Sequence, residues 1–394
     1  MSASDLTRTG RLTELAKLFL KIGVIGFGGP AAHLAMFEDE IVHRRGWLTD
    51  KEFLDLLGAT NLIPGPNSTE MAIHVGHKRA GFAGLVVAGA CFILPAMLIV
   101  MACAWAYVRF GSLPQAQGIL SGVKPIIIAV ILQALWRLGR TALRTPLLTS
   151  VGVLVAALSF AGMNELLLLF VAGIFCLTMR LLQRVPPTSS AALALASTPG
   201  KLPLAASVTN IGAAGVVTAT ATAFGVWPMF LFFLKVGAVL FGSGYVLLAF
   251  LRADLVERWH WLTESQLLDA VAVGQITPGP LFTTATFIGY VLGGAPAAVV
   301  ATVGIFLPAF VFVAISGPLV PRLRASPLAG AFLDGVVVAS LALMAVVTWQ
   351  LGRAAIVDMK TIMLALASIV LIFIWRINSA WLVLGGSVIG FVFK

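Results

Sequence analysis

The sequence predicts an all-α polytopic membrane protein with two homologous helical halves, inverted halves being the favoured arrangement, and with broken or re-entrant helices. Hydrophobic residues form 59% of the 394-residue chain and charged residues only 11%, whereas soluble domains are about a quarter charged. Residues 270–321 hold no charged side chain. Since about 20 apolar residues make one helical crossing, this stretch is long enough for two. The third observation is an internal repeat.

The repeat joins segments more than two hundred residues apart. The matches at an offset of 214 are residues 19–23 with 233–237, 47–49 with 261–263, and 64–66 with 278–280. After the loss of one residue the offset becomes 213, as in Gly76 with Gly289. A single indel over this distance indicates duplication. Duplicated halves with interrupted apolar segments are typical of transporters whose site lies where the interruptions meet.

We expect four regions: a cytosolic N-terminal tail over 1–13, a first transporter repeat over 14–182, a linker with a small-residue apolar segment over 183–226, and a second repeat over 227–394. The tail is polar and no cleavable signal pattern opens the chain, which favours a cytoplasmic N-terminus. Apolar helices are predicted over 82–108, 115–139, 146–160, 163–182, 295–320, 328–350, 361–375 and 379–393. With shorter pieces, this gives about ten to thirteen crossings or re-entrant segments.

The net charge of +10 does not indicate a nucleic-acid partner. The basic residues lie at the ends of apolar segments, for example Lys78, Arg79 and Arg140, as in cytoplasmic loops of membrane proteins. The cysteines lie inside apolar runs without disulfide or metal spacing. The predicted partners are therefore the lipid bilayer and a small substrate, with no cofactor.

Two polar, helix-breaking segments lie at matching positions, residues 61–70 (NLIPGPNSTE) and 275–284 (QITPGPLFTT). Their shared tripeptides disfavour a continuous helix; these are Pro64, Gly65, Pro66 and Pro278, Gly279, Pro280. Irregular backbone at membrane depth is tolerated only where protein buries it or where it lines a cavity. A surface turn would explain one copy alone, whereas two matched copies favour a substrate-lining role.

The first break is expected to start a new helix, with Asn67 as its cap and Glu70 at the capping-box position. In the second break Thr277 precedes proline in the same way. Two such helix N-termini facing each other would form an anion site of backbone N–H groups and hydroxyls. The hydroxyls nearest the breaks are those of Ser68, Thr69, Thr277 and Thr283.

Lys21 and Lys235 form a second matched pair, each five residues into its apolar segment. Such a lysine either extends its ammonium to the membrane interface or attracts an anion, and the sequence leaves both interpretations open. A polar stretch follows in each half. There Glu40 with Arg44, and its counterpart Asp254 with Arg258, predict i,i+4 ion pairs on an interfacial helix.

Glu70 has no carboxylate counterpart in the second half, and His74 and His77 after it are also unmatched. Glu70 and His74 are therefore candidates for a proton relay in one half only. Glu70 as a plain capping residue explains its place equally well. A metal site at the two histidines is not predicted, because a third ligand is missing.

Jointly, several motifs resemble those of the chromate ion transporter family in its long, two-domain form; they are GFGGP at 26–30, RRGWL at 44–48, the two PGP tripeptides, FGSGY at 241–245 and FLDGV at 332–336. The resemblance covers residues 15–180 and 228–394. It implies a protein of the cytoplasmic (inner) membrane that exports chromate and confers chromate resistance, with sulfate as the look-alike dianion. We expect the protein to be a monomer or a homodimer. The family's glycine and proline motifs carry over to both Pro-Gly-Pro tripeptides and to Gly26, Gly28, Gly29, Pro30, Gly242, Ser243 and Gly244.

Two other classes compete with this interpretation. A chloride-channel-like anion pathway also uses broken helices. A tetrahedral oxyanion needs more hydrogen-bond donors than chloride does, and the Ser, Thr and Asn residues around both breaks favour the oxyanion. An intramembrane pyrophosphate phosphatase needs clustered carboxylates with a nucleophile or base. Glu70 stands alone in its segment, so the chain is not expected to be an enzyme.

Overall fold

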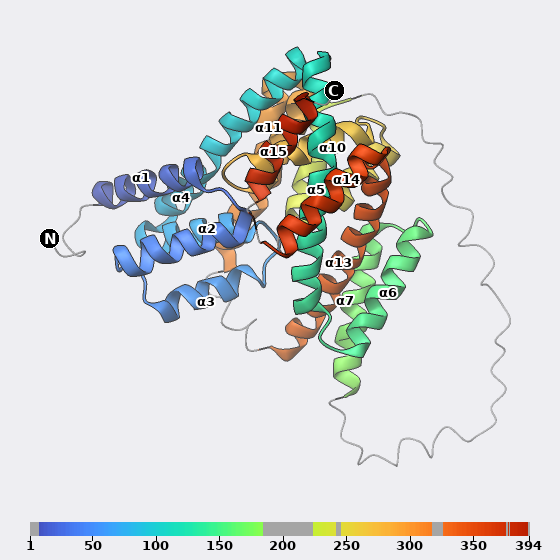
Figure 1. The fold of residues 1–394 in the computed structure, drawn as a ribbon. Coiled ribbons are helices and arrows are strands. Elements are labelled where there is room, and N and C mark those ends of the chain that lie inside the picture. The colour runs from blue at the N-terminus through green and yellow to red at the C-terminus, as the bar shows by residue number, and fades with distance from the viewer. Residues whose placement is uncertain are drawn as a thin grey trace, which may run out of the picture.

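The computed structural model describes residues 8–183, 224–241, 246–316, 326–375, 377 and 379–392. These residues form helices and short connections without any strand (Figure 1). The first half contains α1 (Arg8–Ile25), α2 (Gly29–Glu38), η1 (Asp39–Arg44), α3 (Asp50–Thr60), α4 (Asn67–Phe110), α5 (Pro114–Ala142), α6 (Pro146–Phe160) and α7 (Glu165–Leu182).

The second half repeats this order. It contains α8 (Val226–Val239), α9 (Leu247–Phe250), η2 (Leu251–Arg258), α10 (Glu264–Ile276), η3 (Leu281–Thr283), α11 (Thr284–Ser316), α13 (Pro327–Ala355), α14 (Met359–Phe373) and α15 (Ser379–Val392). The polar stretches form matching π-helices, η1 and η2. Capping boxes start α3 and α10 at the equivalent residues Thr49 and Thr263.

Helix α4 is two helices that reverse direction at Ala80 and Gly81. Gly81 has a φ of +64°, a conformation that glycine adopts without strain. Gly76 packs on Gly84 so closely that a Cβ on Gly76 would lie 2.2 Å from the Gly84 carbonyl oxygen. In a continuous helix these residues would lie about 12 Å apart. The segment 67–79 is therefore a short limb that folds back on the long limb 82–110.

Helix α11 repeats this hairpin, with its turn at Gly293 and Gly294. Gly289 packs on Ala297 across the turn, as Gly76 packs on Gly84. The charge-free residues 270–321 thus contain the end of α10, the second break, a short limb and one long limb. Over the described residues 270–316 the chain does not form the two full crossings that this length allows, because the glycine pair turns the chain back early.

The two halves are inverted relative to each other. A Cβ on Gly139 of α5 would lie 3.8 Å from Leu341 of α13, and a Cβ on Gly352 would lie 3.8 Å from Ile128. The contacts pair the end of each helix with the middle of the other, so α5 and α13 run antiparallel (Figure 1). Both contacts join repeat equivalents, as a pseudo-two-fold axis requires.

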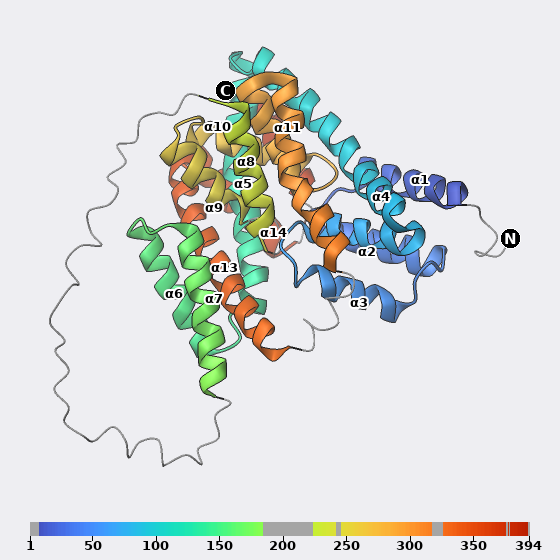
Figure 2. The same cartoon turned by 180° about the vertical axis from the view of Figure 1, so that it is seen from behind.

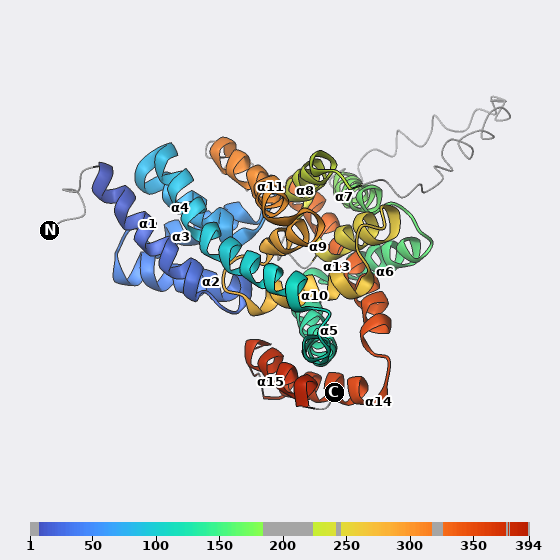
Figure 3. The same cartoon turned by 90° about the horizontal axis from the view of Figure 1, so that it is seen from above.

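The last two helices of each half pack on the other half. Helices α6 and α7 lie against α13, and α14 and α15 lie against α5 (Figure 3). In contrast, α1 packs on α4 and α8 packs on α11 within their own halves (Figure 2). Close glycine contacts seat the exchanged helices: a Cβ on Gly122 would lie 2.2 Å from the Gly386 carbonyl oxygen, and one on Gly335 2.4 Å from that of Ala172. The halves are therefore interlocked.

Five helices in the described residues are long and apolar enough to cross a membrane, and four shorter helices are also apolar. The eight apolar helices predicted from the sequence are confirmed over the described residues, with bounds shifted by up to five residues. Residues 317–320 of the predicted helix 295–320 lie outside the described residues. The apolar stretch 204–226 lies almost wholly outside the described residues, so the total number of crossings stays a prediction.

Candidate functional site

The first break lies between α3 and α4 and is buried inside the protein. Gly65 has a φ of +144°, and a Cβ there would lie 2.2 Å from Glu70 Oε1. Its backbone N–H donates a 2.6 Å hydrogen bond to the carbonyl oxygen of Leu240, at the end of α8 in the other half. The break is therefore attached to the opening segment of the opposite half.

The second break, between α10 and η3, mirrors this arrangement. Gly279 has a φ of +92°, and its N–H donates a 2.9 Å hydrogen bond to the carbonyl oxygen of Gly26. Gly26 and Leu240 are repeat equivalents, as are Gly65 and Gly279. Both breaks are buried and each is bonded to the other half, so the alternative of surface turns does not hold.

Polar atoms without a hydrogen-bond partner gather after the first break. Among the described residues nothing pairs with Asn67 Oδ1, Thr69 Oγ1, either carboxylate oxygen of Glu70, or His74 Nε2. Glu70 and Thr69 are fully buried, and His74 is only 6% exposed. Unsatisfied buried polar groups are costly and point to a water, a proton or a ligand. In the second break, by contrast, the Thr283 hydroxyl donates a hydrogen bond to the Pro280 carbonyl oxygen.

The expected caps at the breaks are wrong. Pro66 occupies the N-cap of α4 and no side chain caps this helix. The Asn67 amide instead donates to Asn61 Oδ1 at 2.8 Å, and Glu70 forms no capping box. Thr277 ends α10 and donates its hydroxyl to the Val273 carbonyl. Because the Asn67 side chain bonds back to Asn61, the N–H groups that start α4 lack the expected side-chain acceptor.

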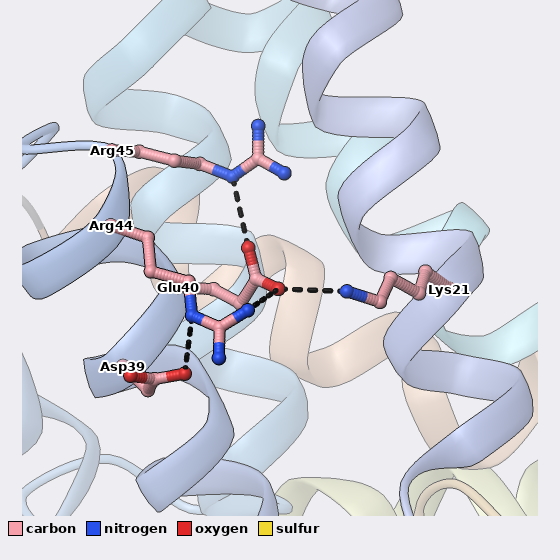
Figure 4. Close-up of polar contacts among 5 residues, drawn as sticks. All are labelled: Lys21, Asp39, Glu40, Arg44 and Arg45. Atoms are coloured by element: carbon pink, nitrogen blue, oxygen red, sulfur yellow. Dashed lines mark hydrogen bonds and ion pairs between the residues drawn. The ribbon is translucent and has the colours of Figure 1, made fainter.

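Lys21 and Lys235 lie in ion pairs. Lys21 Nζ is 2.8 Å from Glu40 Oε1, and Arg44 and Arg45 also contact this carboxylate (Figure 4). The hydrogen bond from Lys21 holds the pKa of Glu40 below its usual range. The predicted i,i+4 pair of Glu40 with Arg44 is confirmed.

The second half repeats the arrangement at Asp254, which pairs with Lys235 and with Arg258. Asp254 is only 3% exposed. The sequence interpretations of the lysines did not include these partners, which lie 19 residues away in each half. A role of Lys21 and Lys235 in binding an anion stays a prediction.

The remaining predicted residues divide between the turns and the breaks. Gly28 and Gly29 have positive φ values at the exposed turn before α2, where a Cβ on Gly29 would meet nothing within 4 Å. It is Gly26, just before them, that contacts the second break. Ser68 is buried in the first turn of α4. Gly242, Ser243 and Gly244 lie outside the described residues.

The sequence analysis missed His33, which supports the second break. His33 is fully buried on α2, and its Nε2 lies 2.8 Å from the carbonyl oxygen of Gly26. Because a carbonyl only accepts, Nε2 carries the proton, and this oxygen receives a second bond from Gly279. The repeat equivalent is Leu247, so a comparison of the halves gives no signal for this role.

Inverted, interlocked halves that bury matching broken helices define a duplicated membrane transporter. The model of the chromate transporter family matches residues 13–177 and residues 227–391, once in each half, and the chain belongs to this family. It is accordingly a multi-pass protein of the cytoplasmic membrane, as the sequence predicted.

Curated relatives align over nearly the whole chain. A chromate transport protein of Cupriavidus metallidurans is 33% identical over 98% of this chain and 94% of its own length. A probable chromate transport protein of Synechococcus elongatus is 33% identical over 93% of this chain and 91% of its own length. A chromate transport protein of Pseudomonas aeruginosa is 34% identical over 86% and 81%, respectively. No solved structure matches the chain.

Proposed function

We propose that this protein is a secondary transporter that exports chromate, a tetrahedral dianion resembling sulfate, across the cytoplasmic membrane. The substrate passes where the two Pro-Gly-Pro breaks meet. The observation that carries the proposal is the reciprocal attachment of the breaks: Gly65 to Leu240 and Gly279 to Gly26. A pathway formed by both halves must have its moving parts coupled across the pseudo-two-fold axis, and these bonds supply that coupling.

The first break offers chemistry suited to an oxyanion. The N–H groups at the start of α4 have no intrahelical acceptors, and the helix dipole places partial positive charge there. The hydroxyls of Ser68 and Thr69 and the amide of Asn67 lie in the same turn. Glu70 in that turn would repel a dianion when it is ionised, so binding requires its protonation or its displacement. This makes Glu70 the candidate coupling residue, with His74 one helical turn further on.

The distribution of basic residues supports an orientation. Lys78 and Arg79 lie at the turn of the α4 hairpin, and Arg137, Arg140 and Arg144 lie around the end of α5. The long limb of α4 and helix α5 each have 29 residues, which is enough to cross the membrane. The chain therefore crosses along α4 and returns along α5, so the two groups of basic residues lie on the same side. The positive-inside rule assigns that side to the cytoplasm.

The membrane potential favours export. With the inside negative, moving a dianion outwards is downhill by about 2.3 kcal/mol per charge per 100 mV, hence about 4.6 kcal/mol for two charges. This corresponds to about three powers of ten in concentration. A coupled proton is therefore not obligatory.

The test is uptake of radiolabelled chromate into everted vesicles, whose cytoplasmic face is outside, with the potential and the proton gradient collapsed separately. We expect accumulation of chromate above its external concentration to be lost when the potential is collapsed and to persist when only the proton gradient is collapsed. Unlabelled sulfate should compete and chloride should not. Competition by chloride alone would favour the chloride-channel-like pathway, and absence of chromate flux from well-folded protein would refute the proposal.

A further inference from the structure

A second buried charge cluster lies away from the breaks, between the two halves. Asp269 on α10 is 2% exposed. Its Oδ2 accepts a 3.0 Å hydrogen bond from the Tyr107 hydroxyl on α4, and its Oδ1 lies 3.3 Å from Lys124 Nζ on α5. Lys124 also donates to Ser265 Oγ at 2.6 Å. Asp269 Oδ1 receives no hydrogen bond from the described residues, so the carboxylate is only partly satisfied.

This cluster lines a cavity of about 410 Å³. The wall is mixed: it includes the polar residues Gln117, Ser121, Ser265 and Thr361 together with Lys124, and apolar residues such as Leu120 and Val357. A water molecule occupies about 30 Å³ in the liquid, so the cavity has room for a small anion with part of its hydration shell. The Lys124 side chain remains 18% exposed, and its ammonium is thus accessible from the cavity.

The fold does not need this ion pair. The repeat equivalent of Lys124 is Val337 on α13, a residue that is 37% exposed in the same helical position. The equivalent of Asp269 is Asp55, which is exposed on α3. One half therefore builds the same helices without the pair. A partly satisfied, buried pair is a weak source of stability, so its presence in the other half calls for a different explanation.

In the orientation proposed above, the cavity lies on the side opposite the cytoplasm. Its residues Tyr107 and Gly111 lie at the end of α4 that is far from the basic hairpin turn. Asp269 precedes Pro278 by nine residues along α10 and its end, a distance of about 13 Å. An anion that leaves the second break towards the outside would meet Lys124 within this distance.

We propose that this cavity is an outer binding site for the transported oxyanion, with Lys124 as the binding cation and Asp269 as a built-in counter-anion that the substrate displaces. The inference rests on the proposed function, because the ligand is the same dianion. Asp269 holds the ammonium in place while the site is empty and weakens binding enough for the anion to leave. Tyr107 and Ser265 keep the separated partners hydrogen-bonded.

The test measures exchange of labelled chromate, varied outside the vesicles, against saturating unlabelled chromate inside them, for the full chain in everted and in right-side-out vesicles. Gln117→Glu adds a negative charge to the cavity wall at an exposed position. We expect it to raise the half-saturation concentration at the outer face by roughly five- to tenfold, with little change at the cytoplasmic face. Gln115→Glu is the matched control, since Gln115 is exposed two residues away and does not line the cavity.

Two further variants give effects of opposite sign. Lys124→Gln should weaken outer-face binding by about tenfold, and Asp269→Asn should tighten it a few-fold, because the competing charge is removed. A purely structural ion pair would lower folded protein in both variants and leave the affinity ratio of the two faces unchanged. That result, or an unaffected Gln117→Glu variant, would overturn the proposal. Absence of wild-type chromate exchange would instead refute the proposed function itself.

Discussion

The backbone N–H of Gly65 donates a hydrogen bond to the carbonyl oxygen of Leu240, and its repeat equivalent Gly279 donates the corresponding bond to Gly26. One bond thus runs from the first half to the second, and the other from the second half to the first. Each broken helix therefore depends on the end of the other half's first helix. A shift of α8 would move the first break, and a shift of α1 would move the second. This reciprocity gives a physical route by which the two halves move together.

Alanine at Gly65 or Gly279 should abolish most transport. Both glycines have positive φ values, and a Cβ on Gly279 would lie 2.5 Å from Ala96 Cβ. Backbone strain and overpacking together cost about 2–4 kcal/mol. Gly162→Ala is the control, because Gly162 has a φ of +82° but a Cβ there would meet nothing within 4 Å. Chromate flux per folded protein is the measurement, and equal losses in all three variants would show that only strain matters.

Lys235→Gln should reduce folded protein more than Lys21→Gln. Among the described residues, Asp254 keeps Arg258 as its one cation when Lys235 is removed, whereas Glu40 keeps Arg44 and Arg45. We expect losses of about 1–2 kcal/mol and under about 1 kcal/mol, respectively. Unfolding of the purified variants measures this difference, and Asp254→Asn should restore the stability of Lys235→Gln. A raised half-saturation concentration at unchanged stability would instead assign the lysines to the anion.

The Lys21–Glu40 pair should make stability, not transport, depend on pH. Since Lys21 lowers the pKa of Glu40, the pair stabilises the fold above the ordinary carboxyl pKa of about 4.3, and this contribution is lost as pH falls through the lowered pKa. Between pH 6 and 8 the carboxylate stays ionised. Thermal unfolding of Glu40→Gln should therefore match the wild type in its pH dependence above about pH 5 and differ below it. A difference centred near neutral pH would contradict this assignment.

The interlocked halves should be sensitive at their glycine contacts. Gly122→Val places a side chain where the Gly386 carbonyl and the Gly390 backbone lie within 3 Å, so α15 must move away from α5. Overpacking of this kind costs about 1–3 kcal/mol. Gly385→Val is the matched control, because a Cβ at that position meets nothing within 4 Å. The measurement is the fraction of each variant that stays folded in detergent after heating, which should be lower for Gly122→Val. Equal fractions for the two variants would indicate that α15 does not pack on α5 as described.

Much of this fold could be predicted from the sequence, because duplication and hydropathy act on residues that are close in the chain. The bounds of α5, α6 and α7 and of their counterparts follow from where charges and prolines end the apolar runs. The reversal at Ala80 and Gly81 did not follow, since a positive φ leaves no hydropathy signal. The breaks were located correctly, but the caps at Asn67 and Thr277 were not, because proline at the N-cap leaves these side chains free to bond backwards.

Contacts without a counterpart in the repeat were also out of reach. Lys124 and Asp269 are 145 residues apart in sequence, and the comparison of the halves pairs Lys124 with a valine. His33 is hidden in the same way by Leu247. The repeat therefore predicts the common scaffold well and conceals the residues that distinguish one half from the other.

Glu70→Gln should keep potential-driven export and flatten its dependence on pH. The Glu70 carboxylate is fully buried without a hydrogen-bond partner among the described residues, directly beside Gly65 and the start of α4. An ionised carboxylate there repels the incoming dianion, whereas a neutral amide of the same shape does not. Export by the wild type should therefore fall as pH rises, and export by the variant should stay near the wild-type maximum. The measurement is chromate uptake into everted vesicles at a fixed potential, from pH 7.5 to 9, where chromate stays a dianion, normalised to folded protein, with His77→Gln as a control on the same helix. Loss of flux in a well-folded Glu70→Gln variant would show that the carboxylate must release its proton in each cycle, and export would then require the proton gradient as well as the potential.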